Sequence, residues 1–447
     1  MALIYFDGYD QYAPVAAPTA AVPITFSTGQ ENLTTVATDP SIYTSTSSAR
    51  FCRFYGEDRV WRFQNAGDTN PTYQLKGNFT YNTNGAGSPY GSLSSGARYG
   101  VQLDTQDTLT NNKKIVVGYK NKVNRYSSHP ISGSHPHLLA AFSRVANFTD
   151  INEGFGIILE GSNVYISGIS NATYGYQCNR GYPTGTAITL IPGQTVLLGA
   201  SNFVAGTNGL STATPPIEQL AYNTVEIEVT AEGKVTCWIN NLYVGSVTFS
   251  DPTRIANMRY VKIGMFMQIY TGSAFTSYGW DGVTDVYCLN GLGTRNVNRL
   301  GKVKVVSRLP TTDASVQFTR PDTSNSNAAV AGQNPPQITP SLIGVKEGDT
   351  DLYAAPAFNF TNEAIIATSV TTTGYKTDPS GNDIAPVLSV TGTNYVGETN
   401  IVPISSSLMK SEQHIYELNP KTGLPFVKSD LDATTFGVTV VAPASGG

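Results

Sequence analysis

The chain has 447 residues, of which only 13% are charged, with a formal net charge of −4 at pH 7 and an isoelectric point near 5.6. This length predicts two or three domains rather than one small module. The charged fraction is about half that of ordinary soluble domains, so we expect much of the surface to be covered in an assembly. A negative chain without clustered Lys and Arg argues against nucleic-acid binding, because phosphate contacts need a basic surface.

Glycine and proline number 43 and 25. They favour turns, as do the frequent Ser and Asn, whereas Thr and Tyr suit pleated strands, so the composition predicts an all-β protein of many short strands. The apolar stretch at residues 3–6, which ends at Asp7, is too short to supply the roughly 7–15 apolar residues of an export signal. No stretch reaches the roughly 18 apolar residues of a membrane span. We therefore expect folding in a cytoplasm, without a signal peptide or membrane insertion.

Residues 1–25 are predicted to form a short amino-terminal motif followed by an extended arm. Prolines at positions 14, 18 and 23 lie in an Ala-rich stretch. Proline fixes φ and lacks an N–H, so this stretch is unsuited to a helix. The arm is interpreted either as a linker or as a segment that reaches over a neighbouring subunit. The densest basic run, residues 113–125, is interleaved with Tyr and Asn and is interpreted as a solvated face.

Residues 26–299 are predicted to form a β-sandwich, because strand signals recur along them. Residues 114–119, KIVVGY, are a near-continuous apolar run of the kind found in the middle of a sheet. Further strands are expected at residues 59–63, 138–142, 154–159, 163–169, 260–270 and 280–288.

The clearest hairpin lies at residues 223–247. In TVEIEVT the apolar side chains alternate with Glu226 and Glu228, and an Ala-Glu-Gly-Lys turn leads into the returning strand KVTCWIN. The alternation predicts that both glutamates face solvent, since a one-residue slip would bury them unpaired. The residues expected inside are Val225, Ile227, Val229, Val235, Cys237 and Ile239.

The composition changes beyond the sandwich. A strand is expected at residues 302–309, and a stretch rich in Thr, Ser, Asn, Ala, Gln and Pro follows at 311–340. A structureless loop of this length is unusual inside a compact domain, so residues 300–340 are interpreted as a strand and an extended linker or strap. Residues 341–447 are predicted to form a smaller carboxy-terminal β-domain or extension. Its expected elements are strands at 364–373, 385–390 and 436–441 and one helical turn at 429–435, with Ser429 as N-cap.

Two pairs of carboxylates are candidates for chemistry. Glu226 and Glu228 lie at i and i+2, about 7 Å apart by strand rise, a spacing that would suit a glycosidase. The jelly-roll glucanases, which this stretch resembles in part, carry a third carboxylate two residues further on, where this chain has Thr230. Asp281 and Asp285 could supply oxygen ligands to calcium. The favoured interpretation is a solvent-facing pair in the first case and no metal in the second, so we predict no catalytic residue and no cofactor.

Histidine, cysteine and tyrosine supply the remaining candidates. His135 and His137 could share a metal but are interpreted as part of a surface loop. The 4 cysteines are scattered without a Cys-x-x-Cys pair, which indicates buried free thiols rather than a zinc site or a disulfide framework. The stretch YGYQCNRGY combines flat rings with polar neighbours, as carbohydrate or protein contact surfaces do. Its candidate contact residues are Tyr174, Tyr176, Arg180 and Tyr182.

Three segments of the chain form an ordered set of motifs. The amino terminus reads MALIYFDGYDQY, residues 280–310 read WDGVTDVYCLNGLGTRNVNRLGKVKVVSRLP, and residues 416–438 read YELNPKTGLPFVKSDLDATTFGV. In order, they resemble an opening Phe-Asp-Gly-aromatic-Asp motif, a Trp-Asp strand with a Gly/Asn loop and a Leu-Gly-x-Val-x-Val segment, and a closing Asn/Asp-Pro-x-Thr-Gly-x-Pro-aromatic motif. Together these resemble tailed-bacteriophage virion proteins that carry a concanavalin-like, laminin-G-like jelly-roll. The resemblance covers nearly the whole chain.

The resemblance implies a structural component of a tailed-phage virion, made in the host bacterial cytoplasm. It leaves open a tail or baseplate fibre, a neck appendage and a capsid decoration protein. With the low charge, the arm and the strap, it predicts a homo-oligomer, first a trimer and second a dimer, with other virion proteins as further partners. The alternatives are an adhesin that binds host-surface glycan and a glycan depolymerase that uses Glu226 and Glu228.

Overall fold

The structure of the protein is a computed structural model. The chain divides into two compact units, one of residues 1–10, 14–24 and 39–305 and one of residues 11–13, 25–38 and 306–447. The residues that the structure describes are 2–8, 25–26, 36–37, 50–52, 63–65, 101–105, 107–125, 137–144, 154–160, 163–172, 175–178, 198–199, 222–249, 252–263, 267–271, 274–321, 325–332, 341–361, 363–378, 381–400 and 410–443.

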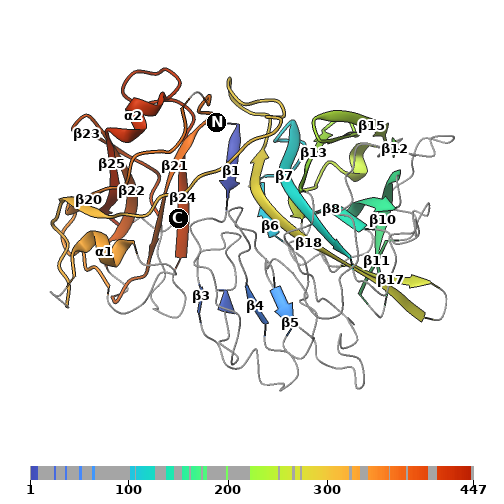
Figure 1. Ribbon diagram of the computed structural model, residues 1–447, viewed down its shortest axis with the longest axis horizontal. Helices are drawn as coiled ribbons and strands as arrows, with labels where there is room; N and C mark the ends of the chain where they lie inside the picture. Colours follow the sequence, from blue (N-terminus) through green and yellow to red (C-terminus); the bar gives the residue numbers. More distant parts are fainter. Residues whose placement is uncertain are drawn as a thin grey trace. The chain divides into compact units, whose positions relative to one another are not determined.

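The first unit contains a seven-stranded antiparallel sheet that runs along β18 and its neighbours (Figure 1). The central strands are long and apolar on at least one face, which suits the middle of a sheet. In spatial order the strands are β1 (Leu3–Asp7), β18 (Ala274–Leu289), β7 (Lys114–Arg125), β13 (Tyr222–Thr230), β14 (Lys234–Ile239) and β15 (Leu242–Thr248), and β17 (Met267–Thr271) also pairs with β18.

A second seven-stranded sheet completes this unit. Its strands, in spatial order, are β11 (Gly175–Cys178), β10 (Asn163–Ala172), β9 (Gly154–Glu160), β8 (His137–Ser143), β16 (Tyr260–Ile263) and β6 (Val101–Asp104), and β12 (Leu198–Gly199) also pairs with β10. The first unit also contains the strand pair β4 (Arg50–Cys52) with β5 (Phe63–Asn65) and the 3₁₀ turn η4 (Pro252–Arg254). The strand pair β2 (Thr25–Phe26) with β3 (Val36–Ala37) belongs to the second unit.

The core of the first unit lies between these two sheets. Tyr119 on β7 is buried and donates its hydroxyl hydrogen to the carbonyl oxygen of Leu139 on β8, at 2.6 Å. On the β8 side, the rings of Phe142 and Phe155 stack with centroids 4.9 Å apart. The two sheets therefore pack face to face as a sandwich.

The hairpin of β13 and β14 has the predicted register. Val225 pairs with Ile239, Ile227 with Cys237 and Val229 with Val235. All six of these predicted core side chains are at most 1% exposed. Each such apolar side chain contributes about 1.5–3 kcal/mol when it leaves water, so the alternating pattern fixes which face of the hairpin is buried.

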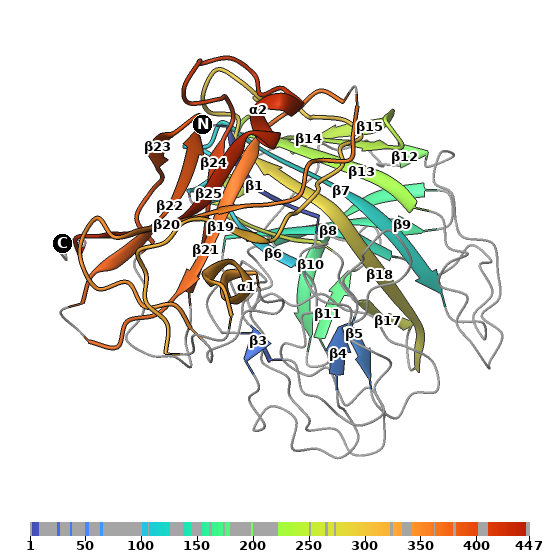
Figure 2. The ribbon, with the colours of Figure 1, turned by 60° about the vertical axis from the view of Figure 1, so that its left-hand side comes forward.

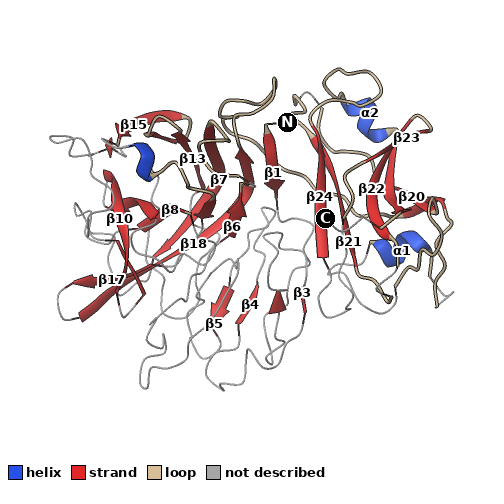
Figure 3. Cartoon of the chain, turned by 180° about the vertical axis from the view of Figure 1, so that it is seen from behind, coloured by secondary structure: helices blue, strands red, loops and turns tan. Residues whose placement is uncertain are grey.

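The second unit is built on a five-stranded antiparallel sheet, seen with its helices in blue in Figure 3. Its core includes Val370, Leu388, Val390, Tyr416 and Phe426. The sheet order is β19 (Thr312–Ser315), β20 (Thr350–Ala354), β25 (Thr434–Val441), β22 (Asp383–Val390) and β23 (Thr393–Val396); the other elements are the pair β21 (Thr368–Gly374) and β24 (Lys410–Tyr416) and the helices α1 (Asn327–Ala331) and α2 (Lys428–Asp432).

These elements confirm the predicted fold class, an all-β protein with a jelly-roll sandwich and a smaller carboxy-terminal β-domain. Figure 2 shows the five-stranded sheet of the second unit from another side. Among the described residues, no helix is both long enough and apolar enough to span a membrane.

Three local predictions are wrong. Residues 302–309 form no strand, because the N–H of Val305 donates to the carboxylate of Asp285 instead of to a neighbouring strand. Within the predicted strap at 300–340, β19 pairs with β20 and α1 follows, so part of the strap belongs to the five-stranded sheet of the second unit. Helix α2 has Val427 rather than Ser429 at its N-cap position, and the N–H of Val427 donates to the Asp430 carboxylate.

A substitution at Gly437 tests the packing of the five-stranded sheet. Gly437 lies on β25 between β20 and β22, and a Cβ atom there would overlap the backbone carbonyl of Asp351. Relief would require the strands to separate, so Gly437→Ala is expected to destabilise the second unit by about 1–3 kcal/mol or more. Urea unfolding followed by hydrogen exchange in β25 measures the change. The control Thr371→Ala, at an exposed position of β21, should stay within about 0.5 kcal/mol; equal effects would contradict the argument.

Candidate functional site

A buried carboxylate lies on the β13 sheet, on the face opposite the sandwich core. Glu226 is 0% exposed. Its Oε1 accepts hydrogen bonds from the Tyr287 hydroxyl at 2.5 Å and from the Gly301 N–H at 2.7 Å. Its Oε2 accepts from Nη1 of Arg299 at 2.7 Å, which is also an ion pair. Glu226, Tyr287, Arg299 and Gly301 are named the outer-face cluster below.

The burial of Glu226 corrects the prediction that this side chain faces solvent. The register is as predicted, so Glu226 does point away from the face of Val225 and Ile227. Residues 299–301 fold back over that second face and supply a guanidinium and an N–H group. A buried carboxylate without partners would be strongly unfavourable, and these donors offset its loss of water.

Glu228 does not form a catalytic pair with Glu226. Its carboxylate accepts from Nζ of Lys114 at 3.1 Å, and the two side chains are partly exposed. Lys114 also donates to Oδ1 of Asn298 at 2.8 Å. The two glutamates therefore have separate cationic partners, and the buried Glu226 is inaccessible to a substrate.

Tyr287 closes the outer-face cluster over the sheet. It pairs across the strands with Gly118 on β7, where a Cβ atom would overlap the tyrosine ring. The glycine in KIVVGY thus makes room for the ring. Burial, and then the charge of Glu226, raise the pKa of the Tyr287 hydroxyl. The phenol therefore stays protonated and acts as a donor to Glu226, and it accepts from the Leu300 N–H at 3.0 Å.

A second buried carboxylate, Asp285, fixes residue 305. The pairing of β18 with β7 is interrupted between Thr284 and Tyr287, and Asp285 has a φ of 51° there. This left-handed conformation at a bulge redirects the side chain. Asp285 forms an ion pair with Lys120 at 2.6 Å and accepts from the Val305 N–H at 2.8 Å.

The geometry of Asp285 bears on the calcium hypothesis. One of its oxygens is paired with a lysine, and the side chain of Asp281 lies outside the described part of β18. Among the described residues no group of three or more His, Cys, Asp and Glu side chains could hold a metal ion. The described oxygens of this region serve protein donors.

The amino-terminal motif packs against the same bulge. Asp7 on β1 pairs with Val286 on β18, and the Gly8 carbonyl accepts from the Thr284 hydroxyl at 2.8 Å. A Cβ atom on Gly8 would lie 3.0 Å from Cβ of Val305, which explains the glycine at this position. Asp7 is the last residue of β1, and Asp10, the other aspartate of the motif, lies outside the described residues. The first two motifs of the sequence therefore meet in space.

Sequence reasoning did not single out Arg299, Tyr287 or Gly118. Arg299 is one of two arginines in a loop that is otherwise rich in Gly and Asn, and Gly118 interrupts an apolar strand. Each residue differs in type from its neighbours in the sequence, and such a difference can indicate a contact with a distant residue. Neither residue's sequence context indicates which residue it contacts. Arg299, for example, binds Glu226, which lies 73 positions away in the sequence.

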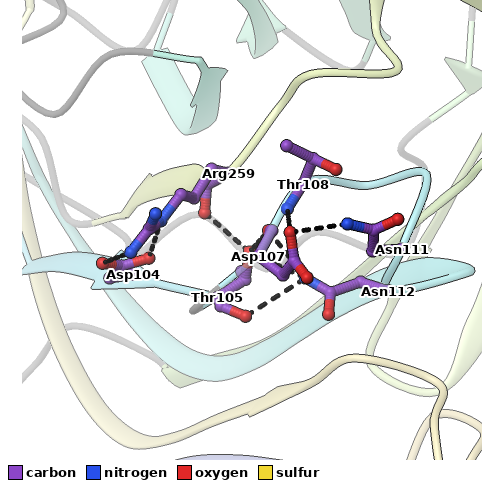
Figure 4. Close-up of polar contacts among 7 residues, drawn as sticks. All are labelled: Asp104, Thr105, Asp107, Thr108, Asn111, Asn112 and Arg259. Carbon is purple, nitrogen blue, oxygen red and sulfur yellow. Dashed lines mark hydrogen bonds and ion pairs between the residues drawn. The ribbon is translucent and has the colours of Figure 1, made fainter. Parts of the chain in front are cut away.

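A network of polar side chains braces the loop between β6 and β7 (Figure 4). Arg259 binds Asp104 through two hydrogen bonds, at 2.6 and 2.8 Å. Asn112 donates to the carbonyl oxygens of Thr105 and Asp107, at 3.1 and 2.8 Å. Two-point pairing and buried amides of this kind fix a backbone. The network therefore positions β6 relative to the segment before β16.

Asp107 caps the same loop. Its Oδ1 accepts from the N–H of Thr108 at 2.7 Å and from the amide of Asn111 at 2.9 Å. These hydrogen bonds, the Asn111 one first, lower the pKa of the Asp107 carboxyl. The carboxylate acts as a local turn acceptor, which is its ordinary role in loops.

The predicted contact surface at YGYQCNRGY is largely outside the described residues. Tyr174, Arg180 and Tyr182 lie outside them, and Tyr176 is described only as a backbone position of β11. His135 also lies outside them, and His137 is described only as the first backbone position of β8. These contact and metal hypotheses remain predictions.

The cysteine prediction is confirmed at two positions. Cys237 and Cys288 are free and 0% exposed. Burial raises the pKa of each thiol to about 12. Cys52 and Cys178 are described only by their backbone.

Both buried thiols are expected to resist alkylation in the folded protein. Because the raised pKa keeps them protonated at pH 8, and because the thiolate is the nucleophile, iodoacetamide should leave Cys237 and Cys288 unmodified. Peptide mass spectrometry before and after unfolding in urea measures this, with full modification expected in urea. Equal labelling rates in the two conditions would contradict the burial of these thiols.

No family model and no curated protein matches the chain. Among solved structures, it is similar to sheep galectin-11 in complex with glycerol, at 12% identity and a TM-score of 0.23, over 44% of this chain and 98% of that one. It is also similar to the botulinum neurotoxin serotype C1 binding domain, at 9% identity and a TM-score of 0.25, over 74% and 84%. A third is Ruminococcus gnavus IT-sialidase CBM40 bound to alpha2,6 sialyllactose, at 11% identity and 0.23, over 42% and 85%. At TM-scores this low, none of them carries an argument about function.

Proposed function

We propose that this protein is a non-enzymatic structural component of a tailed-phage virion that acts through protein–protein contacts. The observation that supports the proposal is the role of the first two motifs that resemble such virion proteins. The strand of the opening motif and the segment at 280–310 meet at the bulge of Asp285 and build a brace rather than a ligand pocket. Their residues serve the integrity of the sandwich.

The closing motif supports the same role in a different way. Its Asn419 is 1% exposed and accepts from the N–H of Lys421 at 3.0 Å, while its carbonyl accepts from the Gly423 N–H at 2.8 Å. This fixed turn leaves Leu424 63% exposed. A large apolar side chain on a rigid loop suits contact with a partner protein.

The depolymerase alternative has little support from the described residues. A glycosidase needs two carboxylates that flank one accessible glycosidic bond. Glu226 is sealed by Arg299 and Tyr287, and Glu228 is paired with a lysine. This geometry favours a stabilising role for both.

Self-association is the first test of the proposal. Four of the most exposed large apolar side chains belong to the second unit, so we expect contacts between copies to concentrate there. They are Val345, Leu424, Val427 and Val396. A symmetric homo-oligomer is expected, a trimer first and a dimer second. Light scattering at micromolar concentration measures it, and a strictly monomeric protein would contradict this expectation.

Matched variants locate the interface. Leu424→Ser removes an apolar contact from the second unit and is expected to shift the oligomer toward monomer by at least about tenfold in dissociation constant. Leu242→Ser, at a comparably exposed position of the first unit, should leave the mass unchanged. Cryo-electron microscopy of the intact particle would then assign the chain to the tail, neck or head. Absence of the chain from purified particles would contradict the virion role.

A further inference from the structure

Strand β15 presents an aromatic ring to solvent directly after the turn that joins it to β14. Tyr243 is 61% exposed, and it is the only aromatic residue among the exposed large hydrophobic side chains of the described residues. Leu242 beside it is also exposed. The two neighbouring side chains form a small exposed apolar patch, and such a patch is a candidate contact surface.

The backbone that carries Tyr243 is rigid. Asn240 and Asn241 have φ values of 52° and 67°, as a two-residue hairpin turn requires. The Asn240 side chain accepts from the Thr224 N–H at 3.0 Å and donates to Oδ1 of Asn223 at 2.9 Å. Asn241 accepts from Nη1 of Arg299 at 2.7 Å. The turn is therefore tied to β13 and to the outer-face cluster.

The ring of Tyr243 is held in a fixed orientation. It meets the ring of Trp238 edge-on, with centroids 6.4 Å apart and an interplanar angle of 67°. Its hydroxyl donates to Oγ of Ser246 at 3.1 Å. The guanidinium of Arg299 lies 4.9 Å from the centroid of Trp238. These contacts fix the tyrosine without covering it, so the side-chain entropy lost on binding a ligand is small.

We propose that this surface, made of Trp238, Asn241, Tyr243 and Ser246, binds a single neutral pyranose ring of a surface polysaccharide. A sugar ring has an apolar face of C–H groups that can lie on an aromatic ring, and hydroxyls at its rim that need polar partners. The oxygen of Asn241 accepts from Arg299, which directs its NH₂ group away from the guanidinium and toward solvent. Ser246 offers a second hydroxyl beside the ring.

The charges favour a neutral ligand. The guanidinium of Arg299, which lies over Trp238, is paired with Glu226, and residues 299–301 cover the buried carboxylate of Glu226. Neither group leaves a net charge directed at the surface. The described surface combines one exposed aromatic ring with the polar groups of Asn241 and Ser246, which matches the apolar face and the rim hydroxyls of a single sugar ring. This binding would be additional to the proposed structural role and does not depend on it.

The test uses the whole 447-residue chain and three variants of it. The probes are the methyl glycosides of glucose, galactose and mannose and a linear trisaccharide of each. Their binding to the protein is measured by saturation-transfer-difference NMR. We expect saturable binding of at least one probe. Tyr243→Ala should weaken it about tenfold or more, whereas Tyr243→Phe, which keeps the ring, should change it by less than about threefold. Val316→Ala, at an exposed apolar position of the second unit, should leave binding unchanged.

Three results would overturn this proposal. The first is the absence of saturation transfer from every probe, and the second is binding that Tyr243→Ala leaves intact. The third is self-association that depends on Tyr243 in a protein that binds no saccharide, which would make the surface a protein interface. Circular dichroism of Tyr243→Ala should match the parent protein, because the substituted side chain is exposed. The oligomer and particle experiments are separate, so failure here and failure of the structural role are distinguishable.

Discussion

Glu226→Ala is expected to lower the free energy of unfolding of the first unit by about 3–5 kcal/mol, because it removes one partner of a buried ion pair. The carboxylate accepts from Tyr287, Arg299 and the backbone of Gly301. Without it the tyrosine hydroxyl and the guanidinium lose their acceptor, and residues 299–301 lose their attachment to β13. The loss therefore exceeds the value of any one hydrogen bond.

The measurement is urea unfolding with hydrogen exchange read in β13 and β18. Glu226→Gln keeps the size of the side chain but not its charge, so it should fall between the parent protein and the alanine variant. Glu228→Ala is the matched control, since this glutamate is partly exposed and holds only Lys114. Its effect should be below about 1 kcal/mol. Equal destabilisation by Glu226→Ala and Glu228→Ala would refute the sealed position of Glu226.

Asp351→Ala is expected to destabilise the second unit by about 3–5 kcal/mol. Asp351 on β20 is 0% exposed. Its Oδ1 accepts from the N–H groups of Gln317 and Phe318, and its Oδ2 accepts from the amide of Asn327 and the hydroxyl of Tyr353. Alanine would leave these donors buried without an acceptor. Burial, and then the charge of Asp351, raise the pKa of Tyr353, so its hydroxyl stays a donor.

Hydrogen exchange in β20 and α1 measures this change during urea unfolding. Both elements should open at lower urea in Asp351→Ala, because Asn327 belongs to the first turn of α1. The control is Asp349→Ala, whose carboxylate accepts from the exposed N–H of Lys346 at 2.8 Å. We expect about 1 kcal/mol or less from this loss. An unchanged exchange rate in α1 for Asp351→Ala would show that the helix is held by other contacts.

The three motifs show what local sequence patterns reveal and what they leave undetermined. Three motifs were identified from the sequence by their resemblance, and their strands, loops and turns are now described for much of their length. That the first motif lies beside the second could not be read from the chain. Their contact, through Thr284 and Gly8, joins residues separated by 276 positions, and local propensity carries no information at that distance.

The sequence by itself determined the all-β class and the faces of the β13–β14 hairpin. Alternation in TVEIEVT and KVTCWIN fixes which side chains meet, because neighbouring strand residues point to opposite faces. It likewise placed the two thiols of Cys237 and Cys288 among buried residues. These features follow from the alternation of side chains along a strand and from the polarity of each side chain, and both can be read from the local sequence.

Only the tertiary structure decided what covers the second face of that hairpin. Alternation divides a strand into two faces, but it cannot tell a face that meets water from one that meets another segment. Glu226 is polar in either case, and its burial depends on Arg299 and Gly301 returning over it from 73 and 75 residues further along. A buried carboxylate is tolerated where donors of matching geometry reach it, and the folding of the whole chain brings those donors there.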